Sequence, residues 1–322
     1  MVKYILKRLL LSVLILLGVS LILFVLIQNM PSSFAENKIN EMNAGGAIVD
    51  ESTKEAIIKM YDISYFEWLK KIVTFDFGES FTQQLPVVDV IKRDMFVSFL
   101  VAAVATVFEF MIAIPLGITA ATHQYSFRDY FVTVMVMIGI SLPAFFFGQV
   151  LKGIFAYNGL LGLLPSSGLG DATQSATGIA YILEYIKYLI LPVMTVVILS
   201  IGGRMRMTRT NMLEVLNSDY IRTARAKGLR EQVVIYKHAF RNTMIPLVTS
   251  LAGLLPSLFS GAIITEQVFD LPGIGNTAYQ AMIKGDVNLI MGYNMFLALL
   301  SIIGILLSDL MYAVVDPRVK LK

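Results

Sequence analysis

The sequence contains no cysteine, only two histidines, and few charged residues for its length. The absence of cysteine from all 322 residues excludes a disulfide framework, a thiolate metal site and a cysteine nucleophile. His123 and His238 lie far apart in the chain, so a zinc site or a histidine-based catalytic centre is not expected. Charged residues make up 15% of the chain and hydrophobic residues 56%, whereas soluble domains carry about 25% charged residues. This deficit of charge predicts an integral membrane protein.

The signatures of enzymes that hydrolyse nucleotides or esters are also missing. No G-x-x-x-x-G-K-[ST] phosphate-binding loop occurs anywhere in the chain. Ser166 and Ser167 lie in a Leu-Pro-Ser-Ser-Gly segment that lacks the G-x-S-x-G spacing of a nucleophilic serine. We therefore expect no catalytic residue and no cofactor in this chain. Energy for any transport has to come from an ion gradient or from another polypeptide.

Long apolar runs, each near the length needed to cross a bilayer, are the main positive feature. The sequence predicts an all-α membrane protein with six transmembrane helices. The expected spans are Leu9–Ile27, Phe96–Ala121, Phe131–Ala156, Tyr188–Gly202, Ile245–Ile264 and Gly292–Val315.

The distribution of basic residues orients these spans, because Lys and Arg are retained on the cytoplasmic side of short loops. Residues 204–241 carry nine Lys or Arg against three acidic residues, and the N-terminus adds Lys3, Lys7 and Arg8. Residues 30–94, in contrast, hold eleven acidic residues against seven basic ones. Both termini are therefore predicted to be cytoplasmic. The net charge of +3 reflects this asymmetry and does not indicate nucleic-acid binding.

These spans divide the chain into four expected regions. They are an N-terminal transmembrane helix (1–30), an extracytoplasmic loop with short helices (31–94), a five-helix core that includes a cytoplasmic loop at 204–245 (95–315), and a cytoplasmic tail (316–322). Within the outer loop, residues 51–61 and 66–75 are predicted to be helical. Trp68 gives the second of these helices an apolar face suited to the outer membrane interface.

Three charged residues fall inside the apolar runs, where a charge costs about 2.5–3.5 kcal/mol on insertion scales. Asp309 is expected near the inner interface, and Lys152 is expected to extend outward to the headgroups. Glu109 lies near the middle of the second span. Its carboxyl either contributes to a translocation path or is hydrogen-bonded inside the helix bundle.

The basic loop at 204–246 has the signals of a short helix. Ser218 or Asn217 is suited to the N-cap position, and Asp219 favours the positive end of the helix dipole. Gly228 suits the C-terminal end, where a left-handed residue is common.

The helix that these signals predict is about ten residues long and cytoplasmic. Ala224 and Ala226 are small enough to permit close approach of another surface. From the residues alone, the segment is either a docking element for a partner or a solvated amphipathic loop.

The sequence of this loop resembles that of one known family. Residues 212–229 and 238–246 resemble the EAA loop of the membrane permease subunits of bacterial ABC importers, in the form found in the peptide/nickel (oligopeptide–dipeptide) uptake family. The general pattern places Glu-Ala-Ala six, five and four residues before a glycine. This chain keeps Ala224 and Gly228 but has Arg222 and Thr223 in the first two places. Further matches are Phe77–Ser80, Ile114–Gly117, Leu164–Gly168, Glu266–Gly275 and Asp316–Arg318.

The resemblance implies a type I ABC importer permease, most similar to the oligopeptide permease B-type subunit, in the bacterial cytoplasmic membrane. Its expected partners are a second homologous permease, two ATPase subunits that bind ATP and magnesium, an extracellular peptide-binding protein and a peptide substrate. The permease itself would perform no bond chemistry. The resemblance also implies a coupling helix that docks on an ATPase subunit, formed by Asn217, Ser218, Asp219, Tyr220, Ile221, Arg222, Thr223, Ala224, Arg225, Ala226, Lys227, Gly228 and Leu229.

Two alternatives stay open at this point. An ion-coupled secondary transporter would work without an ATPase, but it predicts buried acids matched across an inverted repeat, and no such repeat is visible. Within the ABC class, dipeptides, nickel chelates or haem are alternative substrates. The outer loop departs from the family pattern, since residues 60–66 join the two short predicted helices almost directly.

Overall fold

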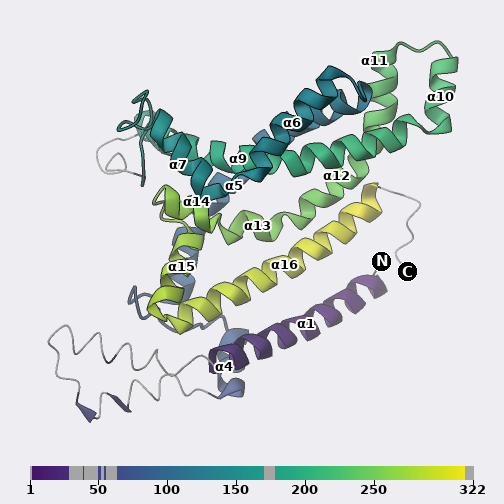
Figure 1. The fold of residues 1–322 in the computed structure, drawn as a ribbon. Coiled ribbons are helices and arrows are strands. Elements are labelled where there is room, and N and C mark those ends of the chain that lie inside the picture. The colour runs from purple at the N-terminus through teal and green to yellow at the C-terminus, as the bar shows by residue number, and fades with distance from the viewer. Residues whose placement is uncertain are drawn as a thin grey trace. The chain divides into compact units, whose positions relative to one another are not determined.

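The computed structural model describes residues 2–28, 39, 50, 51, 54, 55, 64–169 and 178–315. In these residues the regular structure is helical, with two isolated β-bridges, Glu79–Pro86 and Ala156–Leu164. Most of the helix predicted at 51–61, and the tail at 316–322, lie outside the described residues. The helices are α1 (Val2–Gln28), α4 (Tyr65–Val73), α5 (Val87–Thr122), α6 (Phe127–Ser141), α7 (Ala144–Phe155), α9 (Ile179–Leu216), α10 (Asp219–Ala226), α11 (Glu231–Val233), the π-helix η1 (Val234–Phe240), α12 (Arg241–Gly253), α13 (Leu255–Ser260), α14 (Ile263–Val268), α15 (Ile274–Lys284) and α16 (Val287–Val315) (Figure 1).

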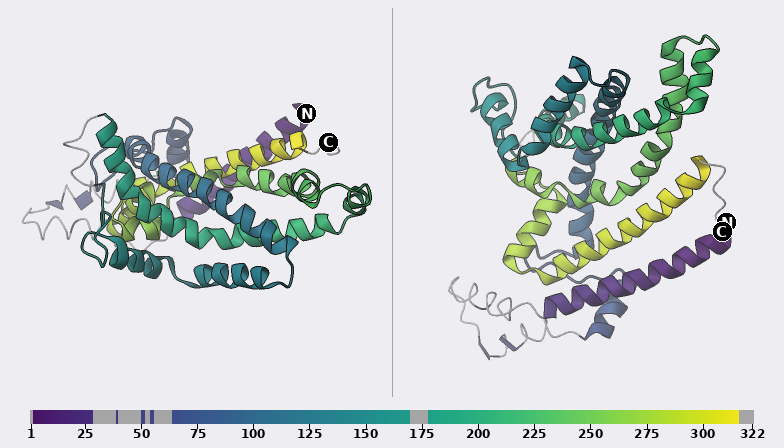
Figure 2. Two further views of the ribbon diagram at one scale, coloured as in Figure 1. Left: turned by 90° about the horizontal axis from the view of Figure 1, so that it is seen from above. Right: turned by 45° about the vertical axis from the view of Figure 1, so that its right-hand side comes forward.

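Four helices of the described part of the chain are long and apolar enough to cross a membrane. The candidate spans Arg8–Leu26, Val87–Thr122 and Val287–Asp309 confirm the first, second and sixth predicted helices. The fourth predicted span was too short, because α9 runs without a break from Ile179 to Leu216. Figure 2 shows this helix as one rod that ends at the turn into α10.

The third predicted span, Phe131–Ala156, is not one helix. It consists of α6 and α7, whose axes are bent by 102° at the break between Ser141 and Ala144. Leu142 has extended backbone angles there, as expected for a residue before proline. Pro143 lacks the N–H that a continuous helix would require. The predicted span is therefore two helices, which form one span only if the bent pair crosses the membrane together.

The fifth predicted span, Ile245–Ile264, is also interrupted. It is divided among α12, α13 and α14, and none of the three has the length of a span. Gly261 interrupts the helix between α13 and α14. Its φ of 72° is a left-handed value that glycine adopts without strain. The described residues therefore give four spans, or five if the bent pair counts as one. The count of six and the cytoplasmic location of both termini stay predictions.

One compact unit is formed by the described residues of 1–94 and 277–302. Its apolar core surrounds Trp68 of α4, which packs against α1 and against Val287, Met291 and Met295 of α16. The Tyr65 and Ser20 hydroxyls, 2.9 Å apart, add a hydrogen bond between α4 and α1. Residues 65–73 confirm the predicted second helix of the outer loop, and Trp68, predicted to lie on its apolar face, is buried against α1 and α16.

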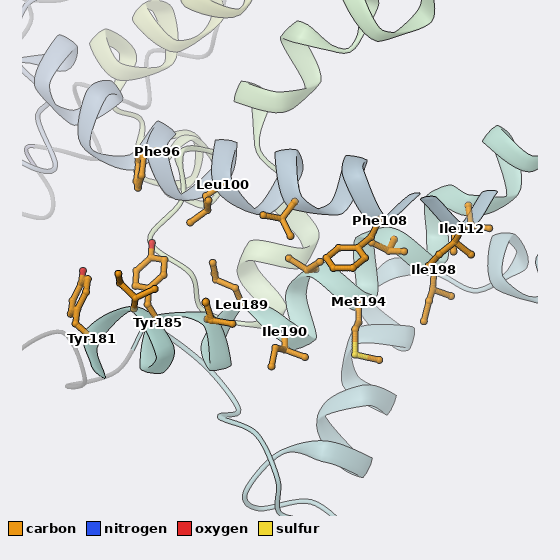
Figure 3. Close-up of a pocket in the computed structure, with 16 residues that line it drawn as sticks. Phe96, Leu100, Phe108, Ile112, Tyr181, Tyr185, Leu189, Ile190, Met194 and Ile198 are labelled. Carbon is orange, nitrogen blue, oxygen red and sulfur yellow. The ribbon is translucent and has the colours of Figure 1, made fainter. Parts of the chain in front are cut away.

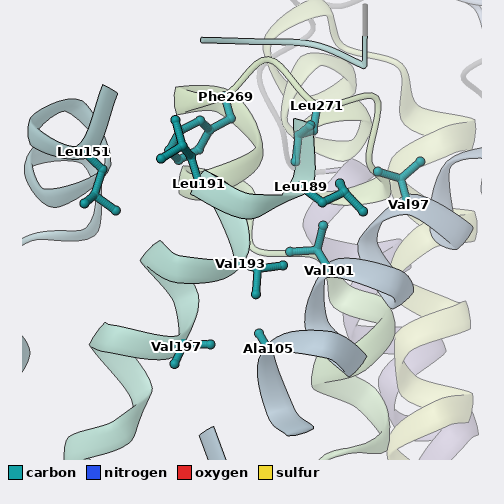
Figure 4. Packing of buried hydrophobic residues seen from close by; sticks show 10 residues of the cluster. All are labelled: Val97, Val101, Ala105, Leu151, Leu189, Leu191, Val193, Val197, Phe269 and Leu271. Carbon is teal, nitrogen blue, oxygen red and sulfur yellow. The ribbon is translucent and has the colours of Figure 1, made fainter. Parts of the chain in front are cut away.

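A second compact unit is formed by the described residues of 95–276 and 303–315. Its largest apolar cluster joins α5, α7, α9 and the segment after α14 (Figure 4). Phe269 and Leu271 contribute the parts of this cluster that follow α14, and both are almost fully buried. The cluster consists of Val97, Val101, Ala105, Leu151, Leu189, Leu191, Val193, Val197, Phe269 and Leu271.

Small residues allow the helices of this unit to approach closely. A Cβ atom on Gly117 of α5 would lie 2.6 Å from the Cβ of Thr208 on α9, too close for any side chain. A Cβ atom on Gly139 of α6 would lie 3.1 Å from the Ile198 carbonyl oxygen of α9, which is also a tight contact but a less severe one. Close contact of this kind drives helix association in lipid, where no hydrophobic force acts between helices.

A buried carboxylate fixes the start of α15 in the same unit. Glu266 is 1% exposed, and its side chain accepts hydrogen bonds from the Ser98 hydroxyl at 2.6 Å and from the Asn276 amide at 2.8 Å. Asn276 lies in the first turn of α15, so the Glu266 carboxyl accepts a backbone hydrogen bond at the start of this helix. Ser98 also accepts from the Ile274 amide at 2.9 Å, which completes a link between α5, α14 and α15.

We predict that Glu266→Ala lowers the melting temperature of the purified protein in detergent by several degrees. The backbone N–H of Asn276 and the Ser98 hydroxyl would lose their acceptor, at a cost of about 1–3 kcal/mol per unsatisfied group. Glu184→Ala is the matched control. Glu184 lies near the surface, and its described ion pair with Lys187 joins two residues of the same helix. Equal melting temperatures for the two variants would contradict this role of Glu266.

Candidate functional site

The predicted docking element forms a helical hairpin at the end of α9. Its helix, α10, spans Asp219–Ala226 and is followed by a tight turn into α11 (Figure 1). Gly228 has a φ of 73°, which confirms that it ends the helix in a left-handed conformation. Ser218 occupies the N-cap position, but its hydroxyl donates to the Val215 carbonyl at 2.6 Å and does not cap α10.

One face of α10 is used inside the chain. Ile221 is fully buried and Ala224 is 7% exposed. Both pack in an apolar cluster with Met212 of α9 and with Val234 and Ala239 of η1. The small side chain of Ala224 thus permits close approach of α9 and η1 from within the chain. Ala226 is exposed and remains available for such an approach.

The opposite face of α10 is exposed and combines basic with apolar side chains. Tyr220 is 48% exposed, and Leu229, just beyond the turn, is 39% exposed. Arg222, Thr223 and Lys227 are exposed on the same segment. A surface of this composition suits a partner groove with an apolar floor and acidic groups at its rim.

An ion pair closes the turn between α10 and α11. Arg225 donates to the two carboxylate oxygens of Glu231 at 2.7 and 3.2 Å. The Arg225 guanidinium lowers the pKa of the Glu231 carboxyl, and the carboxylate raises the pKa of Arg225. This bidentate pair brackets Gly228 and links the end of α10 to the start of α11.

The helices on either side of the hairpin are longer than the sequence predicts. Arg204, Arg206 and Arg209, expected in a loop, lie within the continuous α9. The chain returns from the hairpin through η1 and α12, which contain the predicted motif at 238–246. Long helical rods therefore both enter and leave the hairpin.

Glu109, the predicted translocation residue, is held in an ion pair. Its carboxylate accepts from the Arg204 guanidinium at 3.0 Å, and the side chains of Glu109 and Arg204 are 10% and 12% exposed. Arg204 was not predicted as the partner of Glu109. It could have been, because an acid in an apolar run needs a cation to compensate its charge, and Arg204 is the first basic residue after the apolar run of α9.

Lys152 is likewise bound within the chain. Its ammonium group donates to the Val268 carbonyl at 2.8 Å and lies 5.8 Å from the centre of the Phe269 ring. The expectation that Lys152 extends outward to the headgroups was therefore wrong. The carbonyl and the aromatic ring compensate the charge from inside the protein.

An apolar groove of about 900 Å³ runs between α5 and α9 (Figure 3). Its α5 wall includes Phe96, Leu100 and Phe108, and its α9 wall includes Tyr185 and Leu189. Glu109 is not among the residues that line this groove. None of the lining residues is charged, so the groove offers no charged partner to a polar ligand. The described residues also contain no group of three or more His, Cys, Asp or Glu side chains arranged to hold a metal.

These features define a multi-pass helical membrane protein that presents a rigid basic hairpin outside its apolar helices. The fold is similar to that of a chain from inward-facing conformations of the MetNI methionine ABC transporter. The TM-score is 0.56 at 16% sequence identity, and the match covers 71% of this chain and 97% of the other.

Comparisons of the sequence identify the family. Residues 113–321 match the model of the binding-protein-dependent transport system inner membrane component, and the chain belongs to this family. It is 34% identical to the oligopeptide transport system permease protein AppB of Bacillus subtilis, over 99% of this chain and 100% of that protein. It is 33% identical to the dipeptide transport system permease protein DppB of Alkalihalophilus pseudofirmus, with the same coverage.

We predict that the Arg225–Glu231 pair stabilises the hairpin in a pH-dependent way. Because the pKa of Glu231 is lowered in the folded chain, the stabilisation is present above the ordinary carboxyl pKa and is lost as pH falls through the lowered value. Hydrogen–deuterium exchange of residues 219–233 should therefore be faster in Glu231→Gln than in the unmodified protein at pH 7. The difference should vanish at a pH where Glu231 is protonated, and a difference that persists there would contradict the ion-pair account.

Proposed function

We propose that this chain is the permease subunit of an ATP-binding-cassette importer that carries peptides, most specifically oligopeptides, across the bacterial cytoplasmic membrane. The full-length similarity to proteins named as oligopeptide and dipeptide permeases is the observation that carries this proposal. Dipeptides, nickel chelates and haem are the alternative cargoes. The partners are a second, homologous permease, two ATPase subunits that bind ATP and magnesium, and an extracellular peptide-binding protein.

In this proposal, residues 217–229 form the coupling helix that docks on an ATPase subunit. The exposed face with Tyr220, Arg222 and Thr223 contacts the ATPase, while Ile221 and Ala224 hold the helix on its scaffold. Closure of the ATPases on ATP moves the hairpin as a rigid body, and the transmembrane helices change between inward- and outward-facing packings. The chain itself makes and breaks no bonds.

Ion-coupled transport without an ATPase is the main competitor. It needs a titratable group in the membrane, and the pairing of Glu109 with Arg204 argues against a free proton carrier at that position. A role of Glu109 in the translocation path stays a prediction.

The experiment that tests the proposal is affinity purification from native membranes, followed by mass spectrometry and reconstitution into vesicles. We expect a second permease and two ATPases with phosphate-binding loops to co-purify. Peptide uptake in the presence of the binding protein should then require ATP on the side of the vesicle membrane where the ATPase subunits are bound. Uptake by the chain alone, driven by an ion gradient without ATP, would overturn the proposal.

We predict that Gly228→Val abolishes transport while the protein remains inserted at normal abundance. A β-branched residue resists the left-handed backbone at this position, although a Cβ there would meet nothing within 4 Å. The strain would distort the turn after α10 and so misplace the docking face.

Gly203→Val is the matched control, because Gly203 lies inside α9 with ordinary helical angles and equally open space around its Cβ position. Its uptake should stay within about two-fold of the unmodified protein, since valine has a higher helix propensity than glycine. Unmodified uptake by Gly228→Val at normal abundance would contradict the coupling role of the turn.

A further inference from the structure

The Arg204 side chain joins three helices of the 95–276 unit. Its guanidinium donates to Glu109 of α5 at 3.0 Å and to the Ser250 hydroxyl of α12 at 2.9 Å. It also lies over the Phe110 ring of α5, with 4.6 Å between the guanidinium carbon and the ring centre. Charge, hydrogen bond and aromatic face together compensate a cation that is almost fully buried.

The location of this contact relates it to the hairpin. Arg204 lies in α9, the helix that enters the hairpin, about 18 Å of helix rise before α9 ends at Leu216. Ser250 lies in α12, the helix that continues from η1 after the hairpin. Arg204 therefore ties the entering and returning helices to each other, and ties both to α5.

A rigid connection runs between this contact and the docking face. α9 is unbroken from Arg204 to Leu216, and Met212 near its end packs on Ile221 of α10. Val234 and Ala239 of η1 pack in the same cluster. This packing connects α10 through α9, and through η1 and α12, to the point where Arg204 binds Glu109 and Ser250.

We propose that Arg204 is a positioning residue whose contacts with Glu109 and Ser250 transmit movement of the coupling helix to the membrane-spanning helices. This inference rests on the proposed function as an ATP-driven permease. The contact holds α9 and α12 at a defined place on α5, so that both helices move with the hairpin as one body. Without the contacts of Arg204, the hairpin would still move with the ATPase subunits, but the apolar helices would no longer move with the hairpin.

The chain offers a second ion pair on α9 that serves as a matched control. Arg209 donates to both carboxylate oxygens of Asp129 at 3.0 and 2.9 Å, and Asp129 is 4% exposed. Asp129 lies in α6, which neither enters nor leaves the hairpin. Loss of this pair removes a comparable contact from α9 without separating α9 from α12.

The test measures ATP hydrolysed per peptide imported by the complete complex in vesicles. For Arg204→Gln and Glu109→Gln, we expect this ratio to rise by at least about five-fold, the lower end of typical coupling strengths. Ser250→Ala should raise it by a smaller factor, because only the contact with α12 is lost. Arg209→Gln should lower thermal stability and leave the ratio unchanged.

Several outcomes would overturn the inference. An unchanged ratio for Arg204→Gln, or an equal rise for Arg209→Gln, would show that Arg204 is an ordinary structural contact. If Arg204→Gln does not assemble, Arg204→Lys retains the charge but loses the second donor to Ser250. An unchanged ratio in that variant also overturns the inference, and a raised ratio supports it. Failure of the proposed function is distinct, since the unmodified complex would then show no ATP-dependent import.

Discussion

The free-energy cost of a charge in a low-dielectric interior decides where the charged side chains of this protein lie. Arg204 and Glu109 neutralise each other between α9 and α5, and Lys152 binds a backbone carbonyl of α14. Arg209 pairs with Asp129 in the same way between α9 and α6. Each pair joins two helices, so the need to compensate charge also specifies which helices are neighbours. The hairpin also exposes basic residues, among them Arg222 and Lys227, where they can meet a partner.

The helix α9 connects the apolar helices of this unit to the exposed hairpin. Its first part is apolar and packs on α5, α6 and α7, while its last part carries basic residues and supports α10. Packing in the apolar part depends on glycines that allow close approach, and packing at α10 depends on Ile221 and Ala224 in an apolar cluster. Because no break separates the two parts, a force applied at the hairpin reaches the apolar helices without being absorbed by a loop. The coupling role proposed for the hairpin depends on this continuity of α9.

The sequence predicts the hairpin well, because its signals are local. Ser218 before α10 and Gly228 after it depend on neighbours within one turn of helix. The structure places Ser218 at the N-cap position without a capping bond from its hydroxyl, and it places Gly228 in the left-handed conformation expected at the helix end. Tertiary contacts are less accessible to such reasoning. The inward direction of Ala224 follows from packing on η1, and the pairing of Arg204 with Glu109 joins residues 95 positions apart. The breaks in the third and fifth predicted spans fall at Pro143 and around Gly261, but an apolar run alone does not distinguish a kinked helix from two separate ones.

The most direct test of the central claim is site-specific photo-crosslinking from position 220, on the exposed face of α10, in native membranes. The account predicts a covalent adduct with an ATPase subunit that contains a phosphate-binding loop. A crosslinker at position 221, which is fully buried, should give no such adduct. Adducts at position 220 with lipid or water alone, in cells that express the ATPase subunits, would contradict the coupling account.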